Sequence, residues 1–197
     1  HKLRVFTQTA LNIAMALVIL DRDGVINCNS RHHIKSPDAW KAIPGSLEAI
    51  ARLSRAEFRV VVATNQSGIG RGLFDIGTLN RIHQKMIAQV QEKGGKVDAI
   101  FFCPHTPEAF CSCRKPNPGL LLEVSKRLQI PLSGVPFVGD SMSDLCAAQA
   151  AGALPVLVKT GNGLNTYTEL MKNTKNDLDD VAIFTSLSTF VDSLING

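Results

Sequence analysis

The sequence lacks the features that mark membrane, nucleic-acid-binding and repeat proteins. No run of residues is long and apolar enough to predict a membrane span. No run rich in Lys and Arg contains interleaved aromatic side chains, and the formal net charge is only +4, so we expect neither a nucleic-acid nor a membrane partner. No internal repeat or low-complexity linker divides the 197 residues, a length that supports one domain with a substantial core.

Cysteine is scarce, and three of the five cysteines crowd into eleven positions rather than spreading out as a disulfide framework. A five-residue spacer separates two pairs of possible metal ligands, Cys103 with His105 and Cys111 with Cys113. Three thiolates and one imidazole form a complete ligand set for tetrahedral zinc, with no open position for catalysis. We therefore predict a structural zinc site in a reducing compartment, the cytoplasm. The alternative is a group of free surface thiols beside an incidental histidine.

The first residues of the chain have some features of a signal peptide. Early basic residues are followed by an apolar stretch, and Ala14-Met15-Ala16 resembles a signal-peptidase site. Against export, the apolar stretch runs directly into residues that predict a core strand. We expect residues 1–14 to be a leader or added sequence outside the working fold, and residues 15–197 to form a single domain.

Short apolar runs alternate with amphipathic segments along the rest of the chain. We predict buried strands at 16–20, 58–63, 99–102, 135–138 and 154–158, with an edge strand at 181–184. Helices are expected between them and in the C-terminal tail. This alternation predicts an α/β, Rossmann-like three-layer fold with a mainly parallel sheet, and the intervals leave no room for a large cap domain. Ligands bind such sheets beyond the carboxyl ends of the strands.

Two carboxylates, Asp21 and Asp23, follow the first predicted strand around a turn that contains Gly24. One can attack phosphorus as a nucleophile, and the other can carry a proton to the leaving oxygen and later activate water. The alternative is an ordinary acidic turn, which is common after strands.

A polar loop follows the second predicted strand. Its hydroxyl and amide groups can donate hydrogen bonds to phosphate oxygens without adding charge. We take Thr64 as a catalytic candidate and Asn65, Gln66 and Ser67 as substrate-binding candidates. On its own, the segment is better explained as an ordinary polar loop.

Two later segments carry the charges that phosphoryl transfer needs. Lys115 is a compact point charge, and Arg114 can bind a second phosphate or a sugar hydroxyl with its planar fork. Asp140, after the fourth strand, could complete an oxygen-rich Mg²⁺ site. Asp144, one turn into the next helix, is expected to brace that loop or cap the helix, and Ser141 is a further substrate-binding candidate.

Together and in this order, these motifs resemble the haloacid dehalogenase superfamily, whose phosphatases combine an Asp-x-Asp nucleophile, a Thr/Ser loop, a Lys and a late acidic pair. The resemblance spans roughly residues 17–160. It implies Mg²⁺-dependent hydrolysis of a phosphomonoester, with Asp21 as nucleophile and Asp23 as acid and base. Thr64 and Lys115 would contact the phosphoryl group. Mg²⁺ would bind the carboxylates of Asp21 and Asp140 and the backbone carbonyl of Asp23.

The zinc loop directly before Arg114 narrows the resemblance to the histidinol-phosphate phosphatase group. Segments 21–27 (DRDGVIN) and 64–72 (TNQSGIGRG) are most similar to the branch that removes the 7-phosphate of D-glycero-D-manno-heptose 1,7-bisphosphate, in the synthesis of nucleotide-heptose for lipopolysaccharide or surface glycan. The resemblance implies a small-molecule sugar phosphate as substrate. Because the intervals leave no room for a cap domain, we expect specificity to come from loops 28–41 and 103–113. Nothing in the sequence suggests an obligate partner, so we expect a monomer. Either anomer fits. The alternatives are a histidinol-phosphate phosphatase, a non-catalytic sugar-phosphate-binding module and a zinc-dependent nucleic-acid module.

Overall fold

A computed structural model describes residues 16–30, 32–172, 178 and 180–197, so the predicted leader at 1–14 lies outside the described residues. Within the described residues, six strands form one sheet in the order β3-β2-β1-β4-β5-β6, and every neighbouring pair is parallel. The strands are β1 (Leu17–Leu20), β2 (Arg59–Asn65), β3 (Ala99–Cys103), β4 (Pro136–Gly139), β5 (Leu154–Val158) and β6 (Ala182–Phe184). The predicted fold class is therefore confirmed.

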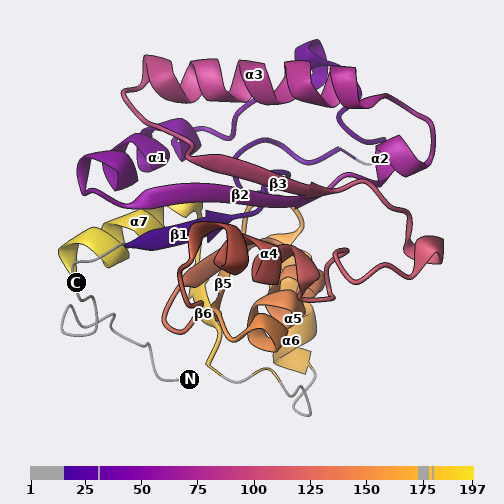
Figure 1. Cartoon of the computed structure of the whole chain (residues 1–197). Helices are drawn as coiled ribbons and strands as arrows, with labels where there is room; N and C mark the ends of the chain where they lie inside the picture. Colours follow the sequence, from indigo (N-terminus) through magenta and orange to yellow (C-terminus); the bar gives the residue numbers. More distant parts are fainter. Residues whose placement is uncertain (1–15, 31, 173–177, 179) are drawn as a thin grey trace.

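Helices cover both faces of this sheet (Figure 1). Alternate residues of each buried strand point to opposite faces, so β1 contributes Val18 and Leu20 to one core and Leu17 and Ile19 to the other. Three helices pack on the first face: α1 (Ser46–Arg55), α3 (Ile76–Glu92) and α7 (Leu187–Asn196). The second face is covered by α4 (Gly119–Leu128) and α5 (Met142–Ala151), while α6 (Gly163–Lys172) follows β5.

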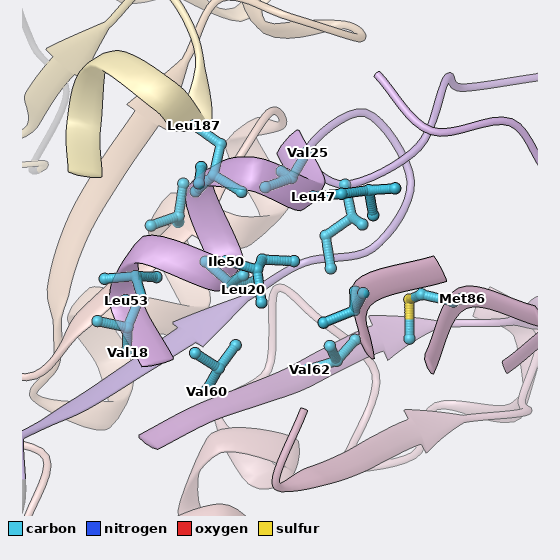
Figure 2. Close-up of a cluster of buried hydrophobic side chains, with 14 of the residues drawn as sticks. Val18, Leu20, Val25, Leu47, Ile50, Leu53, Val60, Val62, Met86 and Leu187 are labelled. Atoms are coloured by element: carbon cyan, nitrogen blue, oxygen red, sulfur yellow. The ribbon is translucent and has the colours of Figure 1, made fainter. Parts of the chain in front are cut away.

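The first core shows how the apolar spacing of α1 matches the sheet. Leu47, Ile50 and Leu53 recur at helical spacing and are buried against side chains of β1 and β2 (Figure 2). Among the described residues, no helix is long and apolar enough to cross a membrane.

Three short helices were not predicted from the sequence: η2 (Pro37–Ala39), α2 (Ser67–Gly70) and η3 (Pro107–Ala109). Each is a single turn, so no apolar periodicity marks it. Local capping and proline produce two of them, because Pro37 and Pro107 each open a turn and the Ser36 side chain accepts a hydrogen bond from the Ala39 amide.

The strand order places a switch point beside β1. β2 and β3 lie on one side of β1, whereas β4, β5 and β6 lie on the other, so the chain leaves the sheet centre in opposite directions. A crevice forms at such a point beyond the carboxyl ends of the strands. Here the Asp21 amide donates to the Val138 carbonyl of β4 over 2.8 Å, which brings the residues following β1 and β4 together.

Candidate active site

A cavity of about 250 Å³ lies at the carboxyl ends of the central strands. Its wall contains nine of the ten predicted catalytic, substrate-binding and magnesium residues: Asp21, Asp23, Thr64, Asn65, Ser67, Arg114, Lys115, Asp140 and Ser141. Gln66 is buried and does not line the cavity. The loop after β1 supplies another part of the wall, with Asn29, Ser30, His33 and Ile34.

Three buried carboxylates meet on one side of this cavity. Oxygen atoms of Asp21, Asp140 and Asp144 lie within 4.8 Å of one another, and each residue is less than a tenth exposed. Burial, and then the charges of Asp144 and Asp21, raises the pKa of Asp140 to about 8. Burial also raises the pKa of Asp21, against the attraction of Lys115. Such a cluster of hard oxygen atoms is a suitable site for a divalent cation, whose charge would favour the ionised forms of Asp21 and Asp140.

Lys115 is the buried cation of the cluster, with 2% of its surface exposed. Its Nζ atom lies 2.9 Å from Asp21 Oδ1 and 2.6 Å from Asp144 Oδ1, and it donates to the Ala63 carbonyl over 3.0 Å. Burial opposes its charge, but the carboxylates of Asp144 and Asp21 prevail and raise the pKa of Lys115. Lys115 therefore stays protonated and holds Asp21 in place.

Asp144 supports the loop after β4 and caps α5. Its Oδ2 atom accepts hydrogen bonds from the Asp140 amide at 3.2 Å, the Ser141 amide at 3.0 Å and the Ser141 hydroxyl at 2.6 Å. The bond from the Ser141 amide forms a capping box together with the bond from the Asp144 amide to the Ser141 hydroxyl oxygen, which is 3.3 Å long. The supporting role expected of Asp144 matches this geometry, and the Ser141 hydroxyl lines the cavity while it is engaged in the cap.

Asp23 is oriented by four side-chain hydrogen bonds. Arg22 binds both of its oxygen atoms over 3.0 Å each. Asn27 donates to Oδ1 over 2.8 Å, and Gln66 donates to Oδ2 over 3.0 Å. Burial works to raise the pKa of Asp23, but the Arg22 charge and these donors outweigh it and lower the pKa below its usual range. Gln66 also donates to Thr64 Oγ1 over 3.0 Å, so it joins the two predicted catalytic residues from beneath the cavity.

Asn65 ties the second strand to the lysine. Its side chain donates to the Lys115 carbonyl over 3.1 Å and accepts from the Lys115 amide over 3.2 Å. This paired contact fixes the backbone from which Lys115 reaches the carboxylates.

The loop after β5 and the first turns of α6 also hold the carboxylate cluster, although no sequence motif pointed to them. The Asn162 amide donates to Asp140 Oδ2 over 2.7 Å, and the Thr166 hydroxyl donates to the Asp140 carbonyl over 2.8 Å. Gly161, directly before Asn162, has φ +57°, and a Cβ atom there would sit 2.3 Å from Asp140 Oδ2 and 2.4 Å from Gly24 Cα. Only glycine permits this close approach.

The predicted zinc ligands converge beside the cavity. The Sγ atoms of Cys103, Cys111 and Cys113 lie 3.2 to 3.6 Å apart, and Nδ1 of His105 lies 3.5 Å from Cys103 Sγ and 3.4 Å from Cys113 Sγ. Zn–S bonds of about 2.3 Å in a tetrahedron give ligand separations of roughly 3.7 Å, close to those found here. These four side chains could therefore hold a metal ion.

A family model described as HAD-hydrolase-like matches residues 112–183. A relative from Bordetella bronchiseptica, named D-glycero-beta-D-manno-heptose-1,7-bisphosphate 7-phosphatase, is 57% identical over 155 residues, which cover 79% of this chain and 87% of the relative. The chain belongs to the haloacid dehalogenase-like hydrolases.

Other members of this hydrolase family agree with that assignment. A Pseudomonas putida protein with the same name as the Bordetella relative is 52% identical, with 85% of this chain and 96% of the relative covered. A crystal structure of the B. bronchiseptica D,D-heptose 1,7-bisphosphate phosphatase, complexed with magnesium and phosphate, has a TM-score of 0.87 at 50% identity, with 92% of this chain and 99% of that chain covered. The Burkholderia thailandensis enzyme has a TM-score of 0.71 at 42% identity, with the same coverage.

Proposed function

We propose that this protein hydrolyses the 7-phosphate of D-glycero-β-D-manno-heptose 1,7-bisphosphate through a phosphoryl intermediate on Asp21. The observation that carries the proposal is the position of Asp21, at the floor of the cavity, 2.9 Å from a buried lysine and next to a fixed acid/base candidate. The names of relatives that are more than half identical support this substrate, and they favour the β anomer, which the sequence motifs left open.

In the first step, a carboxylate oxygen of Asp21 attacks phosphorus, and the bond from phosphorus to the sugar oxygen breaks. Asp23 would pass a proton to that oxygen as the sugar leaves. Because its pKa is lowered in the free protein, Asp23 would first have to take up this proton from the bound substrate or from water. In the second step, Asp23 takes a proton from water, whose oxygen attacks phosphorus and releases phosphate from Asp21. Lys115 balances the negative charge on Asp21 and the transferred group throughout.

The donor sets of the two clusters fit two different metals. Asp21 and Asp140, with the backbone carbonyl of Asp23, would hold Mg²⁺, which prefers one or two carboxylates together with phosphate and water and neutralises charge on the transferred group. Asp144 is already engaged by Lys115 and by its helix cap. The Cys103–Cys113 cluster would hold Zn²⁺, with all four positions filled by protein, so its role is structural.

The zinc loop supports the catalytic residues from both of its ends. At one end, the Cys103 carbonyl accepts from the Gln66 amide over 2.7 Å, and the Pro104 carbonyl accepts from the Gly70 amide over 2.9 Å. At the other end, Cys113 is followed directly by Arg114 and Lys115. Zinc would therefore fix the position of α2 and of the catalytic lysine together.

Specificity would come from the loop after β1 and from Arg114, because the described residues contain no cap domain over the cavity. Asn29, Ser30 and His33 present polar groups to the cavity, which suits the hydroxyls of a sugar. Arg114 also lines it and could bind the phosphate that is retained.

Phosphate release in the presence of Mg²⁺ tests this proposal, with the α and β heptose 1,7-bisphosphates, histidinol phosphate and fructose 1,6-bisphosphate as substrates. We expect a strong preference for the β heptose. Preference for histidinol phosphate would keep the chemistry and overturn the substrate. Failure to hydrolyse any of the four would favour a non-catalytic sugar-phosphate-binding module.

The domain organisation, cellular compartment and oligomeric state are also part of the proposal. The single sheet with a core on each face supports one domain, and the clustered thiolates support a reducing compartment such as the cytoplasm. We further propose that the protein acts as a monomer, which sedimentation analysis would test.

A further inference from the structure

Arg22 is a fully buried cation that has no role in the two proposed reaction steps. Its side chain has no exposed surface, although it lies between the two motif carboxylates in the sequence. Nε donates to Asp23 Oδ1 and Nη2 donates to Asp23 Oδ2, both over 3.0 Å. This parallel pair of bonds fixes the plane of the carboxylate as well as its position.

The remaining end of the guanidinium contacts α3. Nη1 of Arg22 lies 3.1 Å from Nε2 of His83, which is 6% exposed. Arginine can only donate, so Nε2 must accept, and His83 must be the neutral tautomer with its proton on Nδ1. Burial, followed by the Arg22 charge, lowers the pKa of His83 to about 4, in agreement with a neutral ring.

The His83 ring is itself held in place. It packs edge to face against Phe102 of β3, with the ring centroids 6.4 Å apart and the planes at 60°. A chain of contacts therefore runs from the sheet through His83 and Arg22 to Asp23.

We infer that His83 is a positioning residue for the reaction: by accepting from Nη1 it fixes Arg22, and through Arg22 it orients the carboxylate of Asp23. A neutral acceptor suits this position, because a carboxylate there would compete with Asp23 for the guanidinium. Without His83 Nε2, the buried Nη1 group of Arg22 would lose this acceptor. The guanidinium would then rotate toward a different acceptor. The inference rests on the proposed function, in which Asp23 transfers both protons.

Two substitutions separate orientation from mere packing. His83→Leu removes the acceptor, whereas His83→Gln places a side-chain oxygen near the position of Nε2. Val90→Ala serves as the control, because Val90 is buried on the same helix and takes no part in this chain of contacts. Zinc content and thermal unfolding of each variant would establish that it folds.

We expect His83→Leu to lower kcat about tenfold to a hundredfold, the scale of a small misplacement of a reacting group, with KM and the Mg²⁺ requirement unchanged. His83→Gln should recover most of the lost kcat, and Val90→Ala should lower the melting temperature without lowering kcat. Wild-type kcat in His83→Leu, or an equal loss in His83→Gln, would overturn the inference.

A crystal structure of the His83→Leu protein keeps this test separate from the substrate question. We expect the Asp23 carboxylate to have turned from its place in the wild-type protein, whichever phosphate ester the enzyme hydrolyses. An unchanged Asp23 would refute the inference, whereas inactivity of the wild-type protein on heptose bisphosphate would refute only the proposed substrate.

Discussion

Stability of the magnesium-free protein should fall as the pH rises above neutrality. Burial, together with the charges of Asp144 and Asp21, raises the pKa of Asp140 to about 8 from its ordinary value of 3.8. Between these two values, the folded protein keeps a proton on Asp140 that the unfolded chain has already released. The contribution of this group to stability is therefore complete at low pH and is lost as the pH rises through the folded pKa.

The size of the effect follows from the same linkage. One pKa unit corresponds to about 1.4 kcal/mol, and for a pKa of 8 the step from about pH 7 to about pH 9 spans one effective unit. Asp140 alone should therefore lower the free energy of unfolding by about 1.4 kcal/mol over that step. The raised pKa of Asp21 acts in the same direction.

Urea unfolding in magnesium-free buffer, without a chelator that would also remove zinc, measures this slope. Magnesium should raise the free energy of unfolding more at the higher pH, because the cation must displace fewer protons there. Asp140→Asn is the matched control and should show a smaller loss between the two pH values. A wild-type free energy of unfolding that stays level or rises, or a magnesium effect equal at both pH values, would refute the reasoning.

Three substitutions test the supports of the site. Cys111→Ser should release zinc, lower the melting temperature and reduce kcat, as metal analysis and kinetics would show, because the loop anchors Lys115; full zinc content in this variant would contradict the assignment. Gly161→Ala should lower activity at least tenfold by pushing Asp140 aside, and wild-type activity would mean that the loop adapts. Lys85→Met removes hydrogen bonds of 2.7 and 3.0 Å to carbonyls of the loop after β1. This substitution should raise KM several-fold with kcat retained. An unchanged KM would show that the position of this loop does not affect substrate binding.

The strands and the motif residues could be predicted from the sequence, because they follow regular patterns. Each predicted strand is present within two residues of its expected bounds, because buried parallel strands read as continuous apolar runs. The motif residues come together because they follow neighbouring strands, and Asp21 and Asp140 meet at the switch point beside β1. The four zinc ligands converge because their spacing is short.

Apart from Asp144, the residues that support the site could not be predicted, because their contacts join distant segments of the chain. His83 reads as one more position on an amphipathic helix, and only the packing of α3 brings it to Arg22. Asn162 and Thr166 lie beyond the last motif, in the loop after β5 and in α6, and they reach Asp140 only after β5 pairs with β4. Gln66 was expected to bind substrate, yet its amide donates to Asp23 and Thr64 under the cavity wall.

Turnover of the Asp21→Asn protein tests the central claim most directly. The amide keeps the shape of the carboxylate but is a poor nucleophile, so we predict no phosphate release from any substrate that the wild-type enzyme hydrolyses, with the fold and the zinc content intact. Substantial turnover by Asp21→Asn would contradict the covalent mechanism and assign the attack on phosphorus to water.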